Sequence, residues 1–328
     1  MARGIGRGIA RREWLAGAAS LAAAGGAAAA PGQWPERPVR FIVPLAAGGG
    51  ADFVARQFGE VMSRQIGQQV IVENRTGAGG TIGMDAVVRG EPDGYTILVS
   101  SDNVASAAHV LKLSQDYTRV LLPVMALVNQ PQVLAVHPSL GVATLPDFVA
   151  KVKAAGGIGF ASSGVGSNQH VLGAWLARET GIKLEHVPYR GAGQAVNDLI
   201  AGHVKAAVLG PTAVMPHHLA GSVRIIGQSA AKRASVLPDV PTFEEGGAPG
   251  VELIAWNAAF VPPGTPPALV RRINEVFARA IDDPNLREAC KKGIFEPVGG
   301  APDRLAELAQ ADSAKYERLV RELKITSG

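Results

Sequence analysis

Short apolar runs alternate along this chain with longer segments in which apolar residues recur every three or four positions. The short runs are typical of buried strands, and the longer segments are typical of amphipathic helices. The expected strands are residues 39–43, 70–72, 95–99, 132–136, 159–161, 184–187, 206–209 and 223–226. The expected helices are residues 51–66, 83–89, 145–154, 168–180, 192–201, 267–281, 284–292 and 302–323. This alternation predicts βαβ units and mainly parallel sheets, and therefore an α/β fold.

Two long apolar passages, residues 121–139 and 250–266, interrupt the alternation. The other connections are short, so no flexible linker separates two independent domains. We therefore expect two α/β lobes joined by two crossover strands, one from each passage. In this organisation residues 30–128 and 255–328 form lobe 1, and residues 129–254 form lobe 2. A small ligand would bind in the central cleft between the lobes.

The composition is that of a globular protein rich in turns. The 328 residues are 47% hydrophobic and 18% charged, and 40 of them are glycine. Aromatic residues make up only 5%, too few for the stacking surfaces that bind single-stranded nucleic acid. The formal charge is +4, but residues 1–30 hold four arginines and one glutamate, which leaves 28 basic and 27 acidic residues in the rest. No nucleic-acid partner is therefore predicted.

Residues 1–29 have the features of an export signal: a basic start, a weakly apolar middle and small residues at the end. The pair Arg11–Arg12, followed by EWL, resembles a twin-arginine signal. The Ala-rich middle is too short and too mildly apolar to be a membrane anchor. We expect cleavage near Ala29 and a soluble mature protein in a bacterial periplasm.

Two glycine-rich segments lead from expected strands to expected helices, residues 46–52 (AAGGGAD) and 73–86 (ENRTGAGGTIGMDA). Such a junction presents free amide N–H groups and the positive end of a helix dipole, which suit an anion. A plainer explanation is a tight turn in which Asp52 caps the first helix. No GK[ST] sequence follows the glycines, so a nucleotide phosphate loop is not predicted.

Two further junctions carry polar side chains, residues 160–170 (FASSGVGSNQH) and 187–193 (VPYRGAG). Hydroxyl groups and free amides at a helix start are good donors to a carboxylate. Helix capping by serine and asparagine alone is the plainer explanation of the first segment. In the second segment, Arg190 either pairs with a carboxylate or lies exposed to solvent.

An enzymatic interpretation would use Ser163 or Ser167 as a nucleophile with His170 as its base. The Gly-x-Ser-x-Gly pattern is not matched, and no carboxylate lies near His170 in the sequence to orient its ring. The histidines fit no metal-ligand spacing. The single cysteine, Cys290, lies at helical spacing from Leu286 and is expected to be buried. We therefore predict no catalytic residues, no metal and no organic cofactor.

Several motifs, in order along the chain, resemble the Bug-type, or tripartite tricarboxylate transporter, substrate-binding proteins. They include RFIVPLAAGGGADFVAR, VENRTGAGGTIGMDAV, FASSGVGSNQH and VPYRGAGQAVNDLIAGHV. The resemblance covers nearly the whole expected mature chain. It implies a type II periplasmic binding protein fold and a small carboxylate held by backbone amides, hydroxyls and bridging waters. The chain departs at residues 115–119 (QDYTR), where relatives carry an acidic KDF-like element, so a ligand other than the family's common ones is left open.

The loops and the resemblance together predict the ligand-binding residues. In lobe 1 they are Ala47, Gly48, Gly49, Gly50, Gly79, Gly80, Thr81, Ser100 and Ser101. In lobe 2 they are Ser162, Ser163, Gly164, Ser167, Asn168, Tyr189, Arg190, Gly210, Pro211 and Thr212.

The expected function is periplasmic capture of a small carboxylate, whether a di- or tricarboxylate, an amino acid or an aromatic acid. The expected partners are the membrane subunits of a tripartite tricarboxylate-type transporter, and a monomer is expected. Two alternatives stay open: a carboxylate receptor that signals through a sensor protein, and the serine hydrolase described above.

Overall fold

The computed structural model describes residues 34–325, and residues 1–33 and 326–328 are not described. The expected export signal in residues 1–29, with Arg11 and Arg12, therefore lies outside the described residues. A compact unit spans Pro35–Gly328. Within residues 34–325, no helix is both long enough and apolar enough to cross a membrane.

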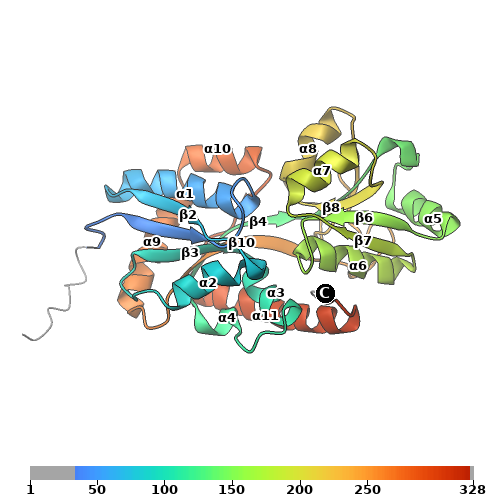
Figure 1. The fold of residues 1–328 in the computed structure, drawn as a ribbon. Helices are drawn as coiled ribbons and strands as arrows, with labels where there is room; N and C mark the ends of the chain where they lie inside the picture. The colour runs from blue at the N-terminus through green and yellow to red at the C-terminus, as the bar shows by residue number, and fades with distance from the viewer. Residues whose placement is uncertain (1–33, 326–328) are drawn as a thin grey trace, which may run out of the picture. The chain divides into compact units, whose positions relative to one another are not determined.

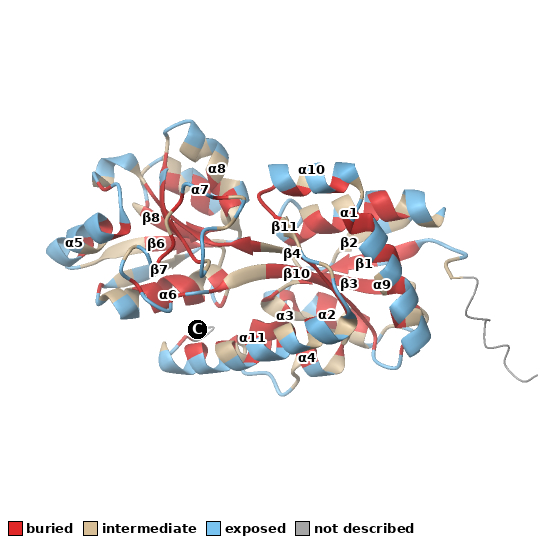
Figure 2. Cartoon of the chain, turned by 180° about the vertical axis from the view of Figure 1, so that it is seen from behind, coloured by how far each residue is buried: buried red, intermediate tan, exposed pale blue. Residues whose placement is uncertain are grey.

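A six-stranded sheet forms the core of the first lobe (Figure 1). Its strand order is β11-β4-β10-β3-β1-β2. The strands are β1 (Val39–Val43), β2 (Val70–Asn74), β3 (Thr96–Ser101), β4 (Leu122–Pro131), β10 (Ile254–Val261) and β11 (Glu296–Pro297). The central strands are almost wholly buried, because helices cover both faces of the sheet (Figure 2).

Two groups of helices cover this sheet, one group on each face (Figure 1). One group is α1 (Gly50–Ile66), α9 (Pro267–Ile281) and α10 (Pro284–Lys292). The other is α2 (Thr81–Val88), α3 (Asn103–Val110), α4 (Tyr117–Val120) and α11 (Pro302–Glu322). On the first face, the ring of Phe277 stacks on Phe41 of β1 at 5.6 Å and lies 5.8 Å from Phe58 of α1. The C-terminal helices thus complete a core that the N-terminal strands begin.

A five-stranded sheet in the order β7-β6-β8-β5-β9 forms the core of the second lobe. The strands are β5 (Val133–Val136), β6 (Ile158–Ser162), β7 (Leu184–Pro188), β8 (Ala206–Leu209) and β9 (Arg224–Gln228). Its helices are α5 (Leu145–Ala155), α6 (Asn168–Thr180), α7 (Ala192–Ile200) and α8 (Pro211–Leu219). Alternate residues of β5 belong to different cores: Val133 and Ala135 pack with α7 and α8, whereas Leu134 and Val136 pack with α5 and α6.

The expectation of mainly parallel sheets is wrong. Four of the nine strand pairings among the described residues are parallel, and the other five are antiparallel. The antiparallel pairings involve β10, β4 and β5, which carry the chain between the two sheets. These strands are not joined to their neighbours by a helical crossover, so the constraint that makes βαβ strands parallel does not apply to them.

Most helix bounds match the sequence prediction, and α6, α9 and α10 match it at both ends. Three helices were not predicted: α3, α4 and α8. Six of the eight residues of α3 are buried, so it has no polar face whose periodicity could reveal it. α8 contains Pro216, a residue that normally indicates the end of a helix.

β4 and β10 lie in the two apolar passages that were expected to cross between lobes, and they pair with each other over their length. β4 leads directly into β5 of the second sheet, and β10 follows the second sheet back into the first. We propose that the lobes divide at these strands, with residues 30–128 and 255–328 in lobe 1 and residues 129–254 in lobe 2.

Candidate functional site

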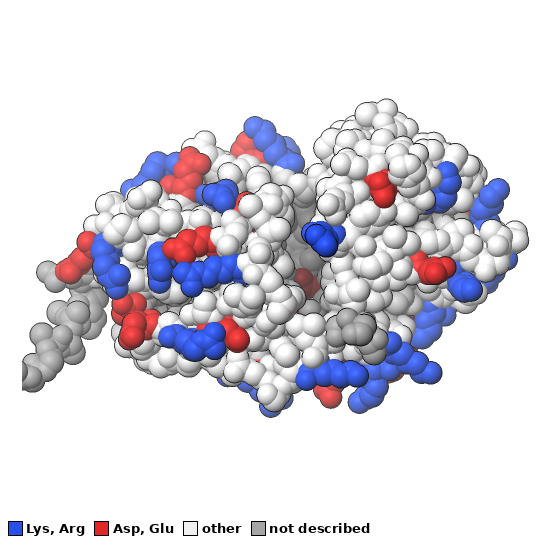
Figure 3. Space-filling model, viewed as in Figure 1, with Lys and Arg blue, Asp and Glu red and all other residues white. Residues whose placement is uncertain are grey.

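The loops of the two lobes meet along one side of each sheet. The backbone of Gly166, between β6 and α6, packs so closely on α3 that a Cβ atom placed there would lie 2.2 Å from Val110 Cγ1. Figure 3 shows a hollow between the half that carries α1 to α3 and the half that carries α6 to α8. Most side chains that border this hollow are uncharged, but a Lys or Arg side chain projects at its mouth and an acidic side chain lies within it (Figure 3).

The loop between β1 and α1 is folded around Asp52. Asp52 does not cap the helix as expected: Gly49 is the N-cap, and Asp52 lies in the first turn. Its carboxylate accepts the Gly48 N–H at 2.9 Å and pairs with Arg56 at 2.9 Å. Burial acts to raise the pKa of Asp52, but the hydrogen bonds from Arg56 and Gly48 outweigh it and lower the pKa.

This arrangement changes which amides of residues 47–50 are available to an anion. The Gly48 N–H is held by Asp52, and the Gly49 N–H points to Ala46 O at 3.3 Å. Within the described part of the chain, the amides of Ala47 and Gly50 have no acceptor. The first loop therefore offers two backbone donors rather than a row of four.

A second loop, residues 77–81, is bound to the start of α3. Gly79 and Gly80 have positive φ angles of 65° and 97°, which favour glycine. Asn103 Nδ2 donates to Gly79 O at 3.2 Å, and Asn103 Oδ1 accepts from Ser100 and Ser101 at 2.7 and 3.2 Å. The hydroxyl of Thr81 donates within its own turn. The structure thus brings Gly79, Gly80, Ser100 and Ser101 together around Asn103, the first residue of α3, which sequence reasoning missed.

The loop after β6 is held by side-chain hydrogen bonds. Ser162 is fully buried, and its hydroxyl lies 2.6 Å from His186 Nε2. The Gly164 N–H donates to that same hydroxyl at 3.1 Å. Ser167 is the N-cap of α6: it accepts the His170 N–H and donates to Gly164 O. These bonds support the loop from within, so Ser162 and Ser167 are structural donors and acceptors.

In the hydrolase alternative, Ser163 or Ser167 would bond to the imidazole ring of His170, and no such bond forms among the described residues. The Ser163 hydroxyl donates to Gln169 Oε1 at 2.7 Å, and His170 Nδ1 accepts the Gly166 N–H at 3.1 Å. The His170 ring stacks on His186, with centroids 3.6 Å apart. Burial and the neighbouring His186 lower the pKa of His170 to about 4, and burial lowers the pKa of His186 to about 4. Two stacked imidazoles with lowered pKa values therefore lie beside the serine-rich loop.

A chain of side-chain amides continues from Ser163 into lobe 2. Gln169 Nε2 donates to Gln132 Oε1 at 2.8 Å, where β4 passes into β5. Gln132 is 1% exposed. The amide chain thus ends at a buried side chain that sequence reasoning did not identify.

Tyr189 and Arg190 are held differently. The Tyr189 hydroxyl donates to Asp198 of α7 at 2.6 Å, and burial together with Asp198 raises the pKa of Tyr189 to about 12. Arg190 is exposed, so the structure favours the second interpretation of this residue.

The start of α8 contacts lobe 1. The Thr212 hydroxyl donates to Gly293 O, and Gln130 Nε2 lies 2.6 Å from Thr212 Oγ1 and 2.9 Å from Ile294 O. Gly210 lies beside Gln130, whose Oε1 would be 3.0 Å from a Cβ atom on this glycine. The predicted segment 210–212 therefore lies where the two lobes touch.

A buried polar cluster joins the lobes on the other side. Asn168 Nδ2 donates to Asp102 Oδ2 at 2.6 Å and to the Tyr316 hydroxyl at 3.0 Å, and that hydroxyl donates to Asp102 at 2.5 Å. Burial raises the pKa of Asp102 to about 6, although the bonds from Tyr316 and Asn168 oppose the shift. Asp102 and Tyr316 were not predicted from the sequence, because they are 214 residues apart.

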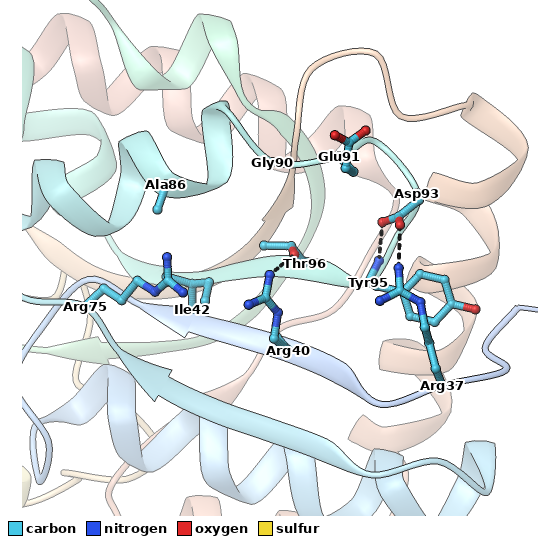
Figure 4. A pocket seen from close by; sticks show the side chains of 10 residues that line it. All are labelled: Arg37, Arg40, Ile42, Arg75, Ala86, Gly90, Glu91, Asp93, Tyr95 and Thr96. Atoms are coloured by element: carbon cyan, nitrogen blue, oxygen red, sulfur yellow. Dashed lines mark hydrogen bonds and ion pairs between the residues drawn. The ribbon is translucent and has the colours of Figure 1, made fainter.

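Two other hollows on the surface contain none of the predicted binding residues. One, of about 190 Å³, is lined in part by Arg37, Arg40 and Arg75 (Figure 4). Their guanidinium groups lie against Asp93, Thr96 and Glu73, respectively, so this hollow is not an open anion site. The other, of about 460 Å³, lies in lobe 2 beside α5 and α8.

No group of three or more His, Cys, Asp or Glu side chains within residues 34–325 is placed to hold a metal ion. Cys290 is buried, and burial raises the pKa of its thiol to about 11. A thiol in this environment packs in the core and is not a metal ligand or nucleophile.

Comparison with known proteins places these features in a family. A family model described as "Tripartite tricarboxylate transporter family receptor" matches residues 54–325. A UPF0065 protein from the tcbD–tcbE intergenic region of Pseudomonas sp. (strain P51) is 36% identical, covering 97% of this chain and 96% of the relative. Protein BugT of Bordetella pertussis is 33% identical, covering 88% of this chain and 90% of BugT.

Solved structures show the same fold. MatC from Rhodopseudomonas palustris with bound malate has a TM-score of 0.79 and 31% identity, covering 88% of this chain and 100% of that one. Rpa4515 from R. palustris with adipate has a TM-score of 0.83 and 27% identity, covering 89% of this chain and 99% of that one. The two α/β lobes described above are therefore those of a type II periplasmic binding protein.

Proposed function

Because this chain belongs to the tripartite tricarboxylate transporter receptor family, we propose that it captures a small carboxylate in the periplasm and presents it to the membrane subunits of such a transporter. The matched length and the similarity to the malate-bound and adipate-bound proteins support this proposal. We also propose that the protein acts as a monomer and carries a twin-arginine export signal.

The observation that supports the proposal is that helix starts from both lobes lie beside the hollow of Figure 3, most of whose walls are uncharged. α1 begins at Gly50 after a glycine loop, and α6 begins at Asn168 after a serine-rich loop. The amides at such starts attract an anion without a fixed positive charge. A bond to a charged group contributes about 1.5–3 kcal/mol, and micromolar affinity needs about 8 kcal/mol. Several bonds from both lobes are therefore required.

The proposed binding segments are residues 47–50, 79–81, 100–101, 162–168, 189–190 and 210–212. Their contributions differ. In the first segment, the amides of Ala47 and Gly50 are the available donors. Several predicted hydroxyls instead hold the loops in shape, including those of Ser162 and Ser167. We propose that ligand closes the lobes as a hinge, because each lobe supplies only part of the donors.

We propose that the protein is not an enzyme. The hydroxyls of Ser163 and Ser167 donate to Gln169 and Gly164, and among the described residues neither bonds to the imidazole ring of His170. A serine nucleophile needs such a base within hydrogen-bonding distance.

The test is native mass spectrometry of protein purified from its own periplasm, followed by calorimetric titration with a panel of carboxylates and their methyl esters. We expect an unchanged carboxylate to be released, the free acid to bind, and the ester to bind at least tenfold more weakly. Small-angle scattering should show a smaller radius with ligand. A released product that differs from the added compound would support the hydrolase, and a failure of every carboxylate to bind would refute the proposal.

A further inference from the structure

The side-chain amide of Asn168 is held in one orientation by two partners from lobe 1. Its Nδ2 donates to Asp102 Oδ2 at 2.6 Å and to the Tyr316 hydroxyl at 3.0 Å. The Tyr316 hydroxyl in turn donates its proton to Asp102 Oδ2. Because an ionised carboxylate only accepts, the nitrogen and oxygen of the Asn168 amide cannot exchange places here. Its Oδ1 is therefore fixed as an acceptor.

This acceptor is buried and has no partner. Asn168 is 6% exposed, and its Oδ1 has no hydrogen bond among the described residues. Asn168 is the first residue of α6, directly after the N-cap Ser167. The oxygen thus lies at the helix start that we propose for the ligand carboxylate. Leaving a buried acceptor without a donor costs free energy. A ligand group that donates to Asn168 Oδ1 removes this cost and therefore binds more tightly.

Two other asparagines provide a contrast. Asn129 of β4 and Asn257 of β10 also have a buried Oδ1 without a partner. Within residues 34–325 their Nδ2 atoms also donate no hydrogen bond, so each amide can turn to present a donor or an acceptor. Neither one selects between ligand groups. In Asn168, by contrast, the cluster with Asp102 and Tyr316 removes this freedom.

We infer that the ligand carries a hydroxyl or ammonium group beside a carboxylate, and that this group donates to Asn168 Oδ1. Asp102 and Tyr316 are then positioning residues, because they act on the ligand only through the orientation of Asn168. This inference rests on the proposed function and narrows its substrate class. A carboxylate oxygen in this position would place an acceptor against an acceptor, and a methylene group would leave Oδ1 unpaired.

The experiment compares matched pairs of carboxylates that differ in one donor group: L- and D-malate or aspartate against succinate, and citrate against tricarballylate. Each compound is titrated calorimetrically into the full-length mature protein. We expect the substituted member of at least one pair to bind about tenfold more tightly, the scale of one buried hydrogen bond. A change of this size must come from the added donor, because the carboxylates of each pair are the same.

Three variants test the assignment to Asn168. Asn168→Ala should bring the ratio of affinities within that pair close to one, mainly by weakening the substituted member. Asp102→Asn keeps Asn168 but replaces the carboxylate, which only accepts, with an amide that can donate or accept, so the Asn168 amide can turn. The ratio should then fall by about threefold or more, part of one hydrogen bond. Asn197→Ala, the same truncation at an exposed position of α7, should leave the ratio unchanged. If Asn168→Ala does not fold, as judged by circular dichroism, Asp102→Asn decides.

The outcomes separate the two proposals. If carboxylates bind but both members of every pair bind equally, a water molecule satisfies Oδ1 and the inference is overturned while the proposed function stands. If the ratio survives both Asn168→Ala and Asp102→Asn, another group recognises the donor and the inference is again overturned. If no carboxylate in the panel binds, the proposed function itself fails.

Discussion

The two loops proposed to hold the carboxylate are built in different ways. The loop of lobe 1, residues 46–50, is shaped by backbone: Gly48 has a φ of +80°, and among the described residues Asp52 is the only side chain that binds its amides. The loop of lobe 2, residues 162–168, is shaped by side chains that bond to it from β7, from α6 and from the opposite lobe.

This difference indicates where each loop is sensitive to mutation. A backbone loop tolerates changes in neighbouring side chains but depends on a few φ angles and one carboxylate. A loop held by side chains depends on partners that are distant in the sequence and on how closely the lobes approach. Lobe 2 should therefore respond to changes in lobe 1, whereas the loop of lobe 1 should respond mainly to changes in its own helix.

The largest effect is expected from Gly166→Ala. The new Cβ would meet Val110 across the lobe contact, and the φ of +73° adds strain. Overpacking of this kind costs about 1–3 kcal/mol, so affinity for the bound carboxylate should fall by tenfold or more. Gly181→Ala is the control, because it has a similar φ of +63° but open space around it. Equal titration results for the two variants would show that this contact is absent from the bound state.

The second prediction concerns the buried carboxylate of Asp102. Its pKa is raised from 3.8 to about 6 in the folded protein, so the folded state binds more protons than the unfolded chain in this range. The free energy of unfolding should therefore decrease as pH rises from about 4 to 6, by at most about 3 kcal/mol. Asp102→Asn removes the titrating carboxyl group, so the free energy of unfolding of this variant should not show this decrease.

The measurement is denaturant unfolding of wild type and Asp102→Asn at pH 4, 5, 6 and 7. The difference between the two proteins isolates Asp102, because the stacked His170 and His186 titrate in both. Their lowered pKa values act in the opposite direction, destabilising the fold as pH falls from about 6.5 to 4. A difference that stays constant across this range would show that Asp102 has an ordinary pKa.

A smaller effect is expected at the loop of lobe 1. Asp52→Ala removes the acceptor for the Gly48 N–H and the partner of Arg56. A bond to a charged group contributes about 1.5–3 kcal/mol to the order of the loop, and we expect part of this, about 1 kcal/mol or about fivefold, to be lost from carboxylate affinity. Asp147→Ala removes an exposed acid from the first turn of α5 and should leave affinity unchanged. A normal affinity for Asp52→Ala would mean that the glycine loop holds its shape without this carboxylate.

The smallest effect is expected from Ser163→Ala. Its hydroxyl donates to Gln169, so truncation should weaken the amide chain to Gln132 rather than remove a direct ligand contact. We expect about a threefold loss of affinity, at the low end for one neutral hydrogen bond. The melting temperature should change less than in Ser167→Ala, which loses the N-cap of α6. A loss above tenfold in titrations of Ser163→Ala would instead place this hydroxyl on the ligand.

The sequence by itself determined the elements whose signals are local. α9 and α10 were predicted at both ends because apolar periodicity, an N1 proline and polar flanks all lie within the segment. The glycine-rich and serine-rich loops were found because a strand, a turn and a helix start follow one another in the chain. Family motifs within these segments were enough to predict a two-lobed carboxylate receptor.

Only the tertiary structure decided which groups meet. The sequence suggested a pair of Ser163 or Ser167 with His170, but Ser162 bonds to His186, which β7 brings beside β6. Likewise, Asn168 was predicted only as a ligand-binding residue, and the structure shows that Asp102 and Tyr316 hold its nitrogen from the other lobe. Hydrogen-bond pairing depends on separations of about 3 Å between segments far apart in the chain, and neither periodicity nor composition carries that information.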